Sequence, residues 1–252
     1  MRKTLFNLYW KLRGLIAPNL RHAQYLYENA LAKQVKKETN WLDLGCGHQV
    51  LPFWREEAER NLIEKCKSIV GMDYDMPALQ KHRSVKLRVR GHLGALPFKD
   101  EHFDLVTANM VVEHLSDPDS QFREINRVLR PGRIFLFHTP NATGYPTLMT
   151  KLVPQRLKHE LIYILDGRSE DDVFPAHYCA NSREQISALA QACGFEVAKI
   201  QMTVSDAVFA LIPPIAIPEL ICLRLLMTKR LEDWRTNIIT VLRKEQRRDL
   251  LA

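Results

Sequence analysis

Short apolar runs alternate with longer amphipathic stretches along much of the chain. The runs Trp41–Leu44, Ser68–Asp73 and Phe103–Met110 are predicted to be buried strands, because each is too short for a helix of ordinary length. Two further strands are predicted over Val85–Val89 and over RIFLFHTPN, residues 133–141. Strands that alternate with helices favour an α/β fold, with a mostly parallel sheet and helices on both faces.

Helices are predicted between these strands. Residues 1–38 are helical in pattern, and amphipathic helices are predicted over Phe53–Lys65 and Asp119–Leu129, the latter ended by Arg-Pro-Gly. The run NSREQISALAQACGFEV predicts a capped helix, a stop at Gly194 and another strand.

Three parts of the chain are predicted. Residues 1–38 form an N-terminal helical lid, and residues 39–206 form a ligand-binding core with an inserted cap over about 142–181. Residues 207–252 supply an apolar segment and then an exposed basic amphipathic helix over 229–248, packed on the core or facing a membrane.

The segment Ala207–Met227 is about as long as a membrane-spanning helix. However, three prolines interrupt it, and Glu219 and Arg224 would be costly at the centre of a bilayer. We therefore expect a packed strand and helix here, or an apolar lid that touches a membrane or an apolar substrate.

Charge adds information about partners. The 252 residues include 36 Lys+Arg and 29 Asp+Glu, which gives a net charge of +7, and residues 1–38 hold eight basic and two acidic side chains. Such a surface attracts nucleic acid, anionic lipid or an acidic substrate, although solvated helix faces explain it equally well. The five cysteines include no CxxC pair, so neither a disulfide framework nor a zinc site is indicated. This fits the cytoplasm, as does an N-terminal stretch that lacks a signal-like apolar core.

Polar residues follow four of the predicted strands, at Gly45–Gly47, Asp73, Gly91–His92 and Asn109. In an open parallel sheet, ligands bind beyond the carboxyl ends of the strands, so these residues should line one crevice. The carboxylate of Asp73 can accept hydrogen bonds from both hydroxyls of a ribose.

Two ligands fit this pattern. NAD requires G-x-G-x-x-G, but the third glycine position is occupied by Val50, which would crowd the helix behind the turn. S-adenosylmethionine (SAM) has no phosphate and needs a turn lined by amides and an early acidic residue, which Asp43 supplies. The residues favour SAM and leave NAD open.

Four motifs in order carry a resemblance to a known family: LDLGCG, GMDYD, ALPFKDEHFDLVTANMVVEHLSDP and INRVLRPGRIFLFHTPN. Together they resemble the class I SAM-dependent methyltransferases, most closely the bacterial group that includes ubiquinone-biosynthesis O-methyltransferases. The resemblance covers about residues 40–141, with a weaker match in HYCANSREQISALAQACGFEV. It implies a Rossmann-like, seven-stranded, mostly parallel sheet with a final antiparallel hairpin, and SAM as methyl donor.

The resemblance also implies cofactor contacts. Gly45 and Gly47 would pass close to the methionine part of SAM, Asp73 would bind the ribose, and Asn109 would face the methyl group. The full set of implied cofactor-binding residues is Asp43, Gly45, Cys46, Gly47, Asp73, Tyr74, His92, Leu93 and Asn109. Two positions depart from the family pattern. His92 stands where an Asp commonly contacts adenine, and Gln49 stands where a further glycine is usual.

Methyl transfer to a hydroxyl is helped by a general base. His114 and His138 are the candidates, and His177 is a weaker one, because all three are expected near the crevice. Glu113 beside His114 does not define a metal site, since two ligands are too few, and no metal is predicted.

The sequence therefore predicts a SAM-dependent methyltransferase that acts on oxygen of a small-molecule, lipid-linked or glycan-precursor acceptor. The basic ends and the apolar segment predict peripheral contact with the anionic inner face of a membrane. An RNA methyltransferase, a non-catalytic SAM-binding protein and an NAD enzyme remain alternatives, and nucleic acid is the weaker partner because no RNA-binding module is recognisable. The acceptor and the oligomeric state are not predicted.

Overall fold

A computed structural model describes residues 2–152 and 175–246. The chain forms two compact units, each assembled from separate stretches of sequence. In the larger unit the described residues are 27–139, 177–201 and 239–246; in the smaller unit they are 2–26, 140–152, 175–176 and 202–238. The units therefore interleave along the chain, whereas the three parts predicted from sequence were continuous.

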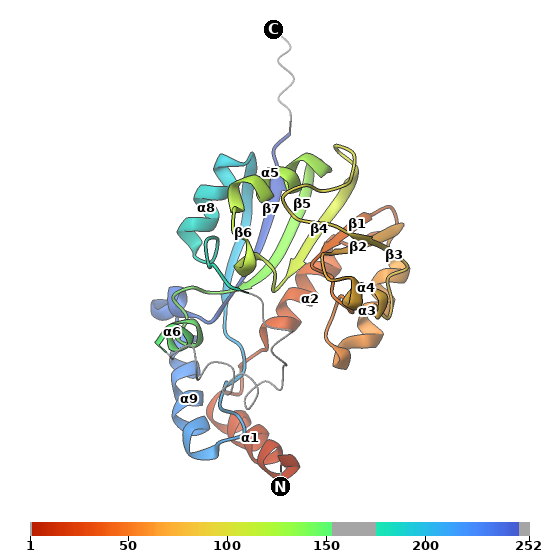
Figure 1. The fold of residues 1–252 in the computed structure, drawn as a ribbon. Helices are drawn as coiled ribbons and strands as arrows, with labels where there is room; N and C mark the ends of the chain where they lie inside the picture. Colours follow the sequence, from red (N-terminus) through yellow and green to blue (C-terminus); the bar gives the residue numbers. More distant parts are fainter. Residues whose placement is uncertain (1, 153–174, 247–252) are drawn as a thin grey trace. The chain divides into compact units, whose positions relative to one another are not determined.

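A seven-stranded sheet has the order β3-β2-β1-β4-β5-β7-β6 (Figure 1). Strand β1 pairs in parallel with β2 and with β4, β2 pairs in parallel with β3, and β4 with β5. The mostly parallel, seven-stranded fold predicted from the sequence is confirmed. The strands are β1 (Asn40–Leu44), β2 (Ser68–Asp73), β3 (Leu87–Arg90), β4 (Phe103–Asn109), β5 (Leu129–Pro140), β6 (Phe195–Thr203) and β7 (Asn237–Lys244).

Helices connect the strands, and local sequence signals start and stop several of them. Asp117 caps α5 by accepting a hydrogen bond from the Ser120 amide at 3.3 Å, and Ser182 caps α8 through the Gln185 amide at 3.2 Å. The α-helices are α1 (Arg2–Ile16), α2 (Ala23–Gln34), α3 (Glu56–Lys65), α4 (Met76–Gln80), α5 (Pro118–Val128), α6 (Tyr145–Leu152), α8 (Arg183–Ala192) and α9 (Pro213–Leu226). The 3-10 turns are η1 (Phe53–Arg55), η2 (Val112–His114) and η4 (Lys229–Trp234).

An aromatic cluster holds α5 on the sheet. The ring of Phe122, on α5, is fully buried and lies 5.4 Å from the ring of Phe135 and 6.4 Å from that of Phe195, both at steep angles. Edge-to-face contacts of this kind stabilise a core beyond the area they bury. Helix α5 also packs against α8, and its Phe122, Ile125 and Val128 are buried, so the amphipathic helix predicted over Asp119–Leu129 has its apolar side inside the fold.

Strand β5 begins earlier than predicted. The predicted helix runs to Leu129 and is followed by an Arg-Pro-Gly break, whereas β5 already starts at Leu129. The pairing with β4 shifts register between Phe103 and Leu105, and Gly132 has a φ of +73°. The Arg-Pro-Gly run is therefore an irregularity within a strand, which a glycine with positive φ accommodates.

The exposed helix predicted over residues 229–248 is wrong. The described part of this segment contains the short turn η4 and then β7, which lies between β5 and β6 in the sheet. Three consecutive β-branched residues, Ile238, Ile239 and Thr240, are buried in β7. Side chains branched at Cβ favour a strand, and here that preference prevails over the helical charge pattern.

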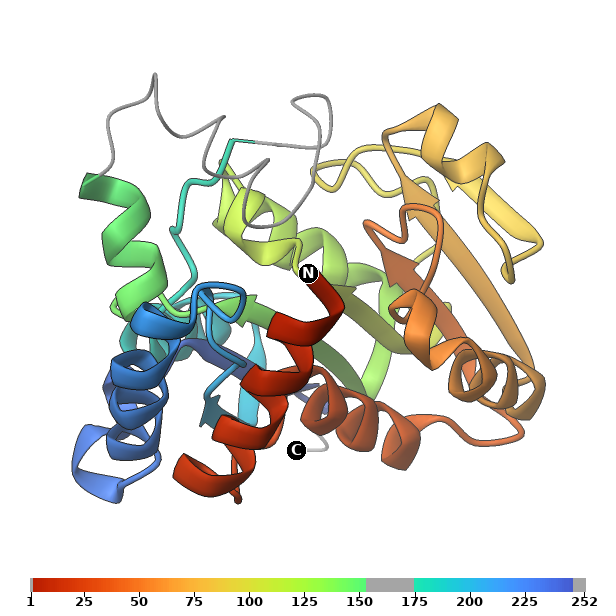
Figure 2. The same ribbon diagram turned by 90° about the horizontal axis from the view of Figure 1, so that it is seen from below.

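The smaller unit has its own core, in which α1 packs along α9 (Figure 2). Tyr9 of α1 and Leu220 and Leu223 of α9 are buried there. Among the described residues, no helix has both the length and the apolar character needed to cross a membrane. The segment Ala207–Met227 is thus not a span; its helical part, α9, packs on α1.

Glu219, the acidic residue of α9, is 7% exposed. Its carboxylate accepts hydrogen bonds from the amides of Val208 and Phe209, at 2.7 and 2.9 Å, and from the Tyr145 hydroxyl at 2.5 Å. A buried carboxylate is tolerated when its oxygens are hydrogen-bonded. Glu219 therefore fixes the chain that leads into α9.

We expect Glu219→Ala to destabilise the protein by about 2–4 kcal/mol, because the two amides and the Tyr145 hydroxyl lose their acceptor inside the unit. Urea unfolding measures this change. The control is Glu64→Ala, which removes an exposed glutamate of α3 and should change stability by less than about 0.5 kcal/mol. Equal stability of the two variants would contradict a structural role for Glu219.

Candidate active site

The direction of strand order reverses between β1 and β4. From β1 the chain continues to β2 and β3 on one side, whereas β4 starts the run to β5 on the other. The carboxyl ends of β1 and β4 lie side by side, since Leu44 is in register with Ala108. Ligands of open α/β sheets bind at such a reversal. Gly45–Gly47 and Asn109 are the residues that the sequence places there.

The turn after β1 places two glycines, which have no side chain, at this edge of the sheet. Gly45 and Gly47 have φ values of +60° and +51°, which other residues rarely adopt. A Cβ on Gly45 would collide with Val111, whereas a Cβ on Gly47 would meet nothing within 4 Å. Gly45 is thus required by packing, and the open space beside Gly47 leaves room for a ligand against the turn. Cys46 between them is buried, and burial raises the pKa of its thiol.

Asp73, at the end of β2, is hydrogen-bonded to the glycine turn. Its Oδ2 accepts from the Gly47 amide at 2.8 Å, and its Oδ1 accepts from the Asp75 amide at 2.9 Å. Each carboxylate oxygen has a second lone pair, so Asp73 can still accept from ribose hydroxyls. Tyr74 follows it and is 51% exposed. An exposed ring at this point is suited to stacking on adenine.

The loop after β3 lies beside Asp73, because the Gly91 amide donates to the Asp73 carbonyl at 3.0 Å. His92 is exposed, and its Nδ1 accepts from the Gly94 amide at 3.3 Å. Leu93 is half-buried. The side chain of His92 thus caps its own turn, which leaves the Leu93 amide as the predicted adenine contact.

Asp43 is a buried acid directly before the glycine turn. It is 3% exposed, and its Oδ1 accepts from the Thr107 hydroxyl at 2.5 Å. Burial raises the pKa of Asp43 to about 7; the Thr107 hydrogen bond opposes the rise, and the charges of Glu59 and Asp73 add to it. A cationic ligand group beside Asp43 would stabilise its ionised form.

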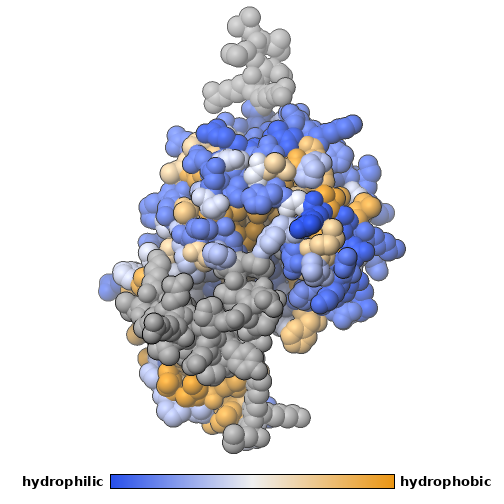
Figure 3. Space-filling view, in the orientation of Figure 1, coloured by the Kyte–Doolittle hydropathy of each residue, from blue (hydrophilic) through white to orange (hydrophobic). Residues whose placement is uncertain are grey.

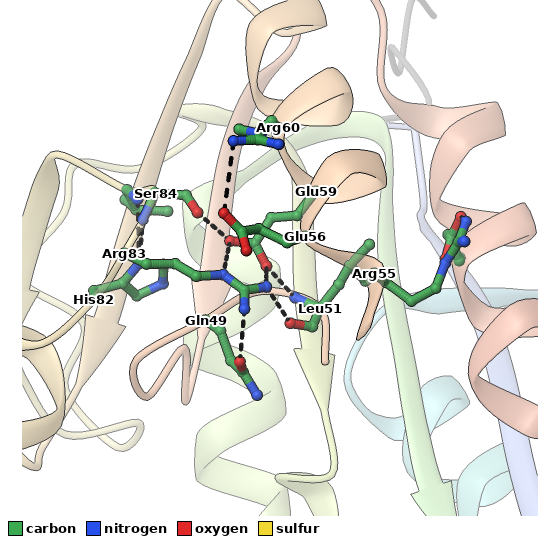
Figure 4. Close-up of polar contacts among 11 residues, drawn as sticks. Gln49, Leu51, Arg55, Glu56, Glu59, Arg60, His82, Arg83 and Ser84 are labelled. Carbon is green, nitrogen blue, oxygen red and sulfur yellow. Dashed lines mark hydrogen bonds and ion pairs between the residues drawn. The ribbon is translucent and has the colours of Figure 1, made fainter. Parts of the chain in front are cut away.

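Gln49, in the place of a glycine, belongs to a network centred on Arg83 (Figure 4). Arg83 donates from Nη1 to Gln49 Oε1 at 3.0 Å and from Nη2 to the Leu51 carbonyl at 2.7 Å. It also donates through Nε and Nη2 to both oxygens of Glu59, a fully buried side chain. Burial alone would raise the pKa of Glu59, but hydrogen bonds from Arg83, Ser84 and the Leu51 amide hold it below its ordinary value. Gln49 is therefore tied to the edge of the turn.

Asn109 and His138 face each other at the ends of β4 and β5. The two residues are in register, and His138 Nδ1 is hydrogen-bonded to Asn109 Oδ1 at 2.9 Å. His138 is 4% exposed, and its ring stacks on that of the buried Tyr27, with 5.8 Å between centroids. This enclosed position is suited to orienting the Asn109 amide.

His114 lies on η2, just beyond the end of β4, and its side chain is 32% exposed. Its Nε2 is 3.9 Å from Oε1 of Glu113, whose side chain is 5% exposed. Oε2 of Glu113 accepts from the Thr139 hydroxyl at 2.9 Å, and Thr139 Oγ1 accepts from Asn181 Nδ2 at 2.7 Å. A fixed, buried carboxylate thus stands beside an accessible imidazole.

His177 joins this region through its backbone, because its amide donates to the Glu113 carbonyl at 2.7 Å, while its side chain is exposed. Across residues 2–152 and 175–246, no three His, Cys, Asp or Glu side chains gather as they would around a metal ion.

The structure adds polar residues that the sequence analysis missed. They have in common that they hold a predicted site residue in place: Thr107 for Asp43, Arg83 and Glu59 for the turn, and Thr139 and Asn181 for Glu113. Thr107 stood out as a polar residue in an apolar strand, a signal that could have been used. The others are far from their partners in sequence, and no local pattern links them.

The sequence model of a protein family described as "Methyltransferase domain" matches residues 19–200 of this chain. The chain belongs to this family. The family match and the parallel sheet thus make residues 19–200 a methyltransferase domain of the class I fold, for which SAM is the cofactor.

Curated relatives agree with this assignment over part of their length. The chain is similar to a probable S-adenosylmethionine-dependent methyltransferase of Mycolicibacterium smegmatis, at 36% identity over 40% of this chain and 37% of the relative. It is also similar to a malonyl-[acyl-carrier protein] O-methyltransferase of Pseudescherichia vulneris, at 28% identity over 50% of this chain and 51% of the relative. A third relative is the ubiquinone/menaquinone biosynthesis C-methyltransferase UbiE of a Shewanella strain, at 42% identity over 29% of this chain and 32% of the relative.

The chain therefore matches about half or less of the length of these relatives.

Among solved structures, the chain is similar to a SAM-dependent methyltransferase of Methanosarcina mazei, with a TM-score of 0.55 and 14% identity over 86% of this chain and 97% of that one. Likeness at this identity shows the shared fold alone.

We expect Asp43→Asn to separate stability from cofactor binding. The pKa of Asp43 is raised from 3.8 to about 7 in the folded protein. The wild type therefore loses stability as the pH rises from about 4 to about 7 and recovers none above it. Without SAM, the variant should be more stable than wild type by about 2–4 kcal/mol near pH 8 and similar near pH 4. It should bind SAM more weakly near pH 8. Urea unfolding measures the stability, and calorimetric titration measures the SAM affinity. A variant that is less stable than wild type at every pH would contradict a raised pKa for Asp43.

We expect the site to tolerate Gln49→Gly. This change removes one of the acceptors of Arg83, so SAM affinity should stay within about threefold and stability within about 1 kcal/mol. Arg83→Leu, in contrast, leaves the buried Glu59 without its cation and should cost about 3–5 kcal/mol. Urea unfolding and SAM titration on both variants measure these changes. Loss of SAM binding in Gln49→Gly would show that Gln49 itself holds the ligand.

Proposed function

We propose that this methyltransferase transfers the methyl group of SAM to a hydroxyl oxygen of a small-molecule, lipid-linked or glycan-precursor acceptor. One observation carries the proposal: the half-exposed imidazole of His114 lies 3.9 Å from the buried carboxylate of Glu113, beyond the end of β4. A histidine backed by a fixed carboxylate is the arrangement that general-base chemistry uses. A hydroxyl acceptor needs such a base, because it must lose its proton as the new bond forms.

In the proposed step, His114 takes the hydroxyl proton while the acceptor oxygen bonds to the methyl carbon. The carbon–sulfur bond breaks, and its electron pair stays on sulfur. SAM, when bound, supplies a methyl group that the positive sulfur already activates. The protein's contribution is then to position the acceptor and to accept the proton. We assign His138 to the orientation of Asn109, because its ring is almost fully buried.

Two of the relatives support the class of reaction but differ in the atom methylated, since one is named an O-methyltransferase and another a C-methyltransferase. The oxygen acceptor is therefore tested directly. Purified protein is incubated with SAM that carries a tritiated methyl group and, separately, with lipid, polar small-molecule and RNA fractions of the source organism. We expect label in the lipid or small-molecule fraction. Hydriodic acid should release the label as volatile methyl iodide, as it does from O-methyl groups, and label that stays bound would contradict O-methylation.

His114→Gln should lower the rate of methyl transfer about a hundredfold or more, because a positioned general base contributes that much. SAM affinity should be unchanged, which separates loss of the base from loss of the cofactor site. The matched control is His177→Gln, which changes an exposed histidine of the same region and should leave the rate within about twofold. Full activity of His114→Gln would rule out His114 as the base.

A further inference from the structure

Helix α9 is apolar on both of its sides. Its inner side, which includes Leu220 and Leu223, is buried against α1. On the opposite side, Ile217, Ile221 and Leu225 are 39%, 48% and 55% exposed. Residues four apart lie on one face of a helix, so these three form a continuous stripe, which we call the α9 outer face.

Three further residues beside this stripe are also without charge. Pro214, Pro218 and Cys222 are exposed, and in α9 they fall on the same side of the helix. Figure 3 shows apolar side chains, in orange, at the place that α9 occupies in Figure 1. A surface helix of a water-facing unit normally carries polar residues on its outer side. The α9 outer face has the composition of a face that meets an apolar partner.

The charges around the outer face are positive. Among the side chains described on α9, the exposed charged one is Arg224, whose Nη1 also donates to the Ile16 carbonyl at 3.1 Å. Lys229 and Arg230, which directly follow α9, are exposed too. The acidic residue of α9, Glu219, is buried and hydrogen-bonded. Acidic side chains return only at the end of η4, with Glu232 and Asp233.

Two kinds of partner would cover an apolar face of this kind: a second copy of the chain or a lipid bilayer. In a symmetric pair, each outer face would meet the same face of its partner, and the basic residues that border it would face one another. Like charges in an interface oppose association. An anionic bilayer instead offers an apolar layer below a negatively charged surface, which complements both features.

We propose that the α9 outer face binds the surface of an anionic lipid bilayer. The helix lies in the plane of the interface, with Ile217, Ile221 and Leu225 in the apolar layer and Arg224, Lys229 and Arg230 at the headgroups. Its 14 residues are too few to cross the bilayer. The surface belongs to the smaller unit and does not depend on the identity of the methyl acceptor.

Vesicle flotation tests the proposal with the whole protein and needs neither SAM nor an acceptor. Vesicles of phosphatidylcholine alone are compared with vesicles that also contain phosphatidylglycerol. We expect the wild type to float with the anionic vesicles, and less so as salt increases. A double variant with Ile221→Gln and Leu225→Gln should lower the partition coefficient between vesicles and water at least tenfold, to about a tenth or less of the wild-type value. The pair Lys229→Gln and Arg230→Gln should lower it about tenfold on anionic vesicles and hardly at all on neutral ones.

The matched control replaces exposed apolar side chains of the larger unit, Leu87→Gln with Val197→Gln, which are 58% and 42% exposed in the wild type. This control should float like the wild type. All variants are first shown to unfold at the same urea concentration. No flotation of the wild type at low salt, or equal flotation of the Ile221/Leu225 variant, would overturn the proposal. So would a wild-type dimer in gel filtration that the same variant abolishes, because the face would then bind a second copy. A wild-type protein that transfers methyl groups but does not float would overturn this proposal and leave the proposed function standing.

Discussion

The hydrogen bond from the Gly47 amide to the carboxylate of Asp73 joins the two strand ends on which the site depends. Strands β1 and β2 bring these residues to the same edge, and this bond, together with the one from the Cys46 amide to the Met72 carbonyl at 3.2 Å, fixes the turn against the end of β2. The second oxygen of Asp73 holds the Asp75 amide, so the side chain that is expected to grip the ribose also organises its own surroundings. The expected ribose contact and the local fold thus depend on the same carboxylate.

Four acidic side chains are buried among the described residues, and each has a different set of hydrogen-bond or ion-pair partners. Glu59 is paired with Arg83, Glu113 accepts from Thr139, and Glu219 accepts from two amides and a hydroxyl. Asp43 has the Thr107 hydroxyl, and burial raises its pKa to about 7. The raised pKa of Asp43 suits a group that binds a positively charged ligand, because such a ligand would stabilise the ionised form.

The local parts of this account could be predicted from the sequence. Short apolar runs predicted the strands of the parallel sheet. The glycine turn with Asp73 favoured SAM without excluding NAD, and the resemblance of four motifs to a known family then implied SAM. The network that fixes Gln49 could not be predicted, since Arg83 is 34 residues away from it. The C-terminal strand was missed because the charged residues spread over 229–248 suggested a helix face, whereas burial of Ile238 and Ile239 determined the outcome. The interleaved units likewise depend on contacts between distant segments.

The central claim is that the glycine turn and Asp73 bind SAM. Calorimetric titration of the wild type with SAM, S-adenosylhomocysteine and NAD, and of Asp73→Asn with SAM, tests it most directly. We expect both adenosyl compounds to bind and NAD not to bind. Asp73→Asn should weaken SAM binding at least about tenfold, because hydrogen bonds to a charged acceptor are worth about 1.5–3 kcal/mol. Binding of NAD without SAM, or unchanged SAM affinity in Asp73→Asn, would contradict the account.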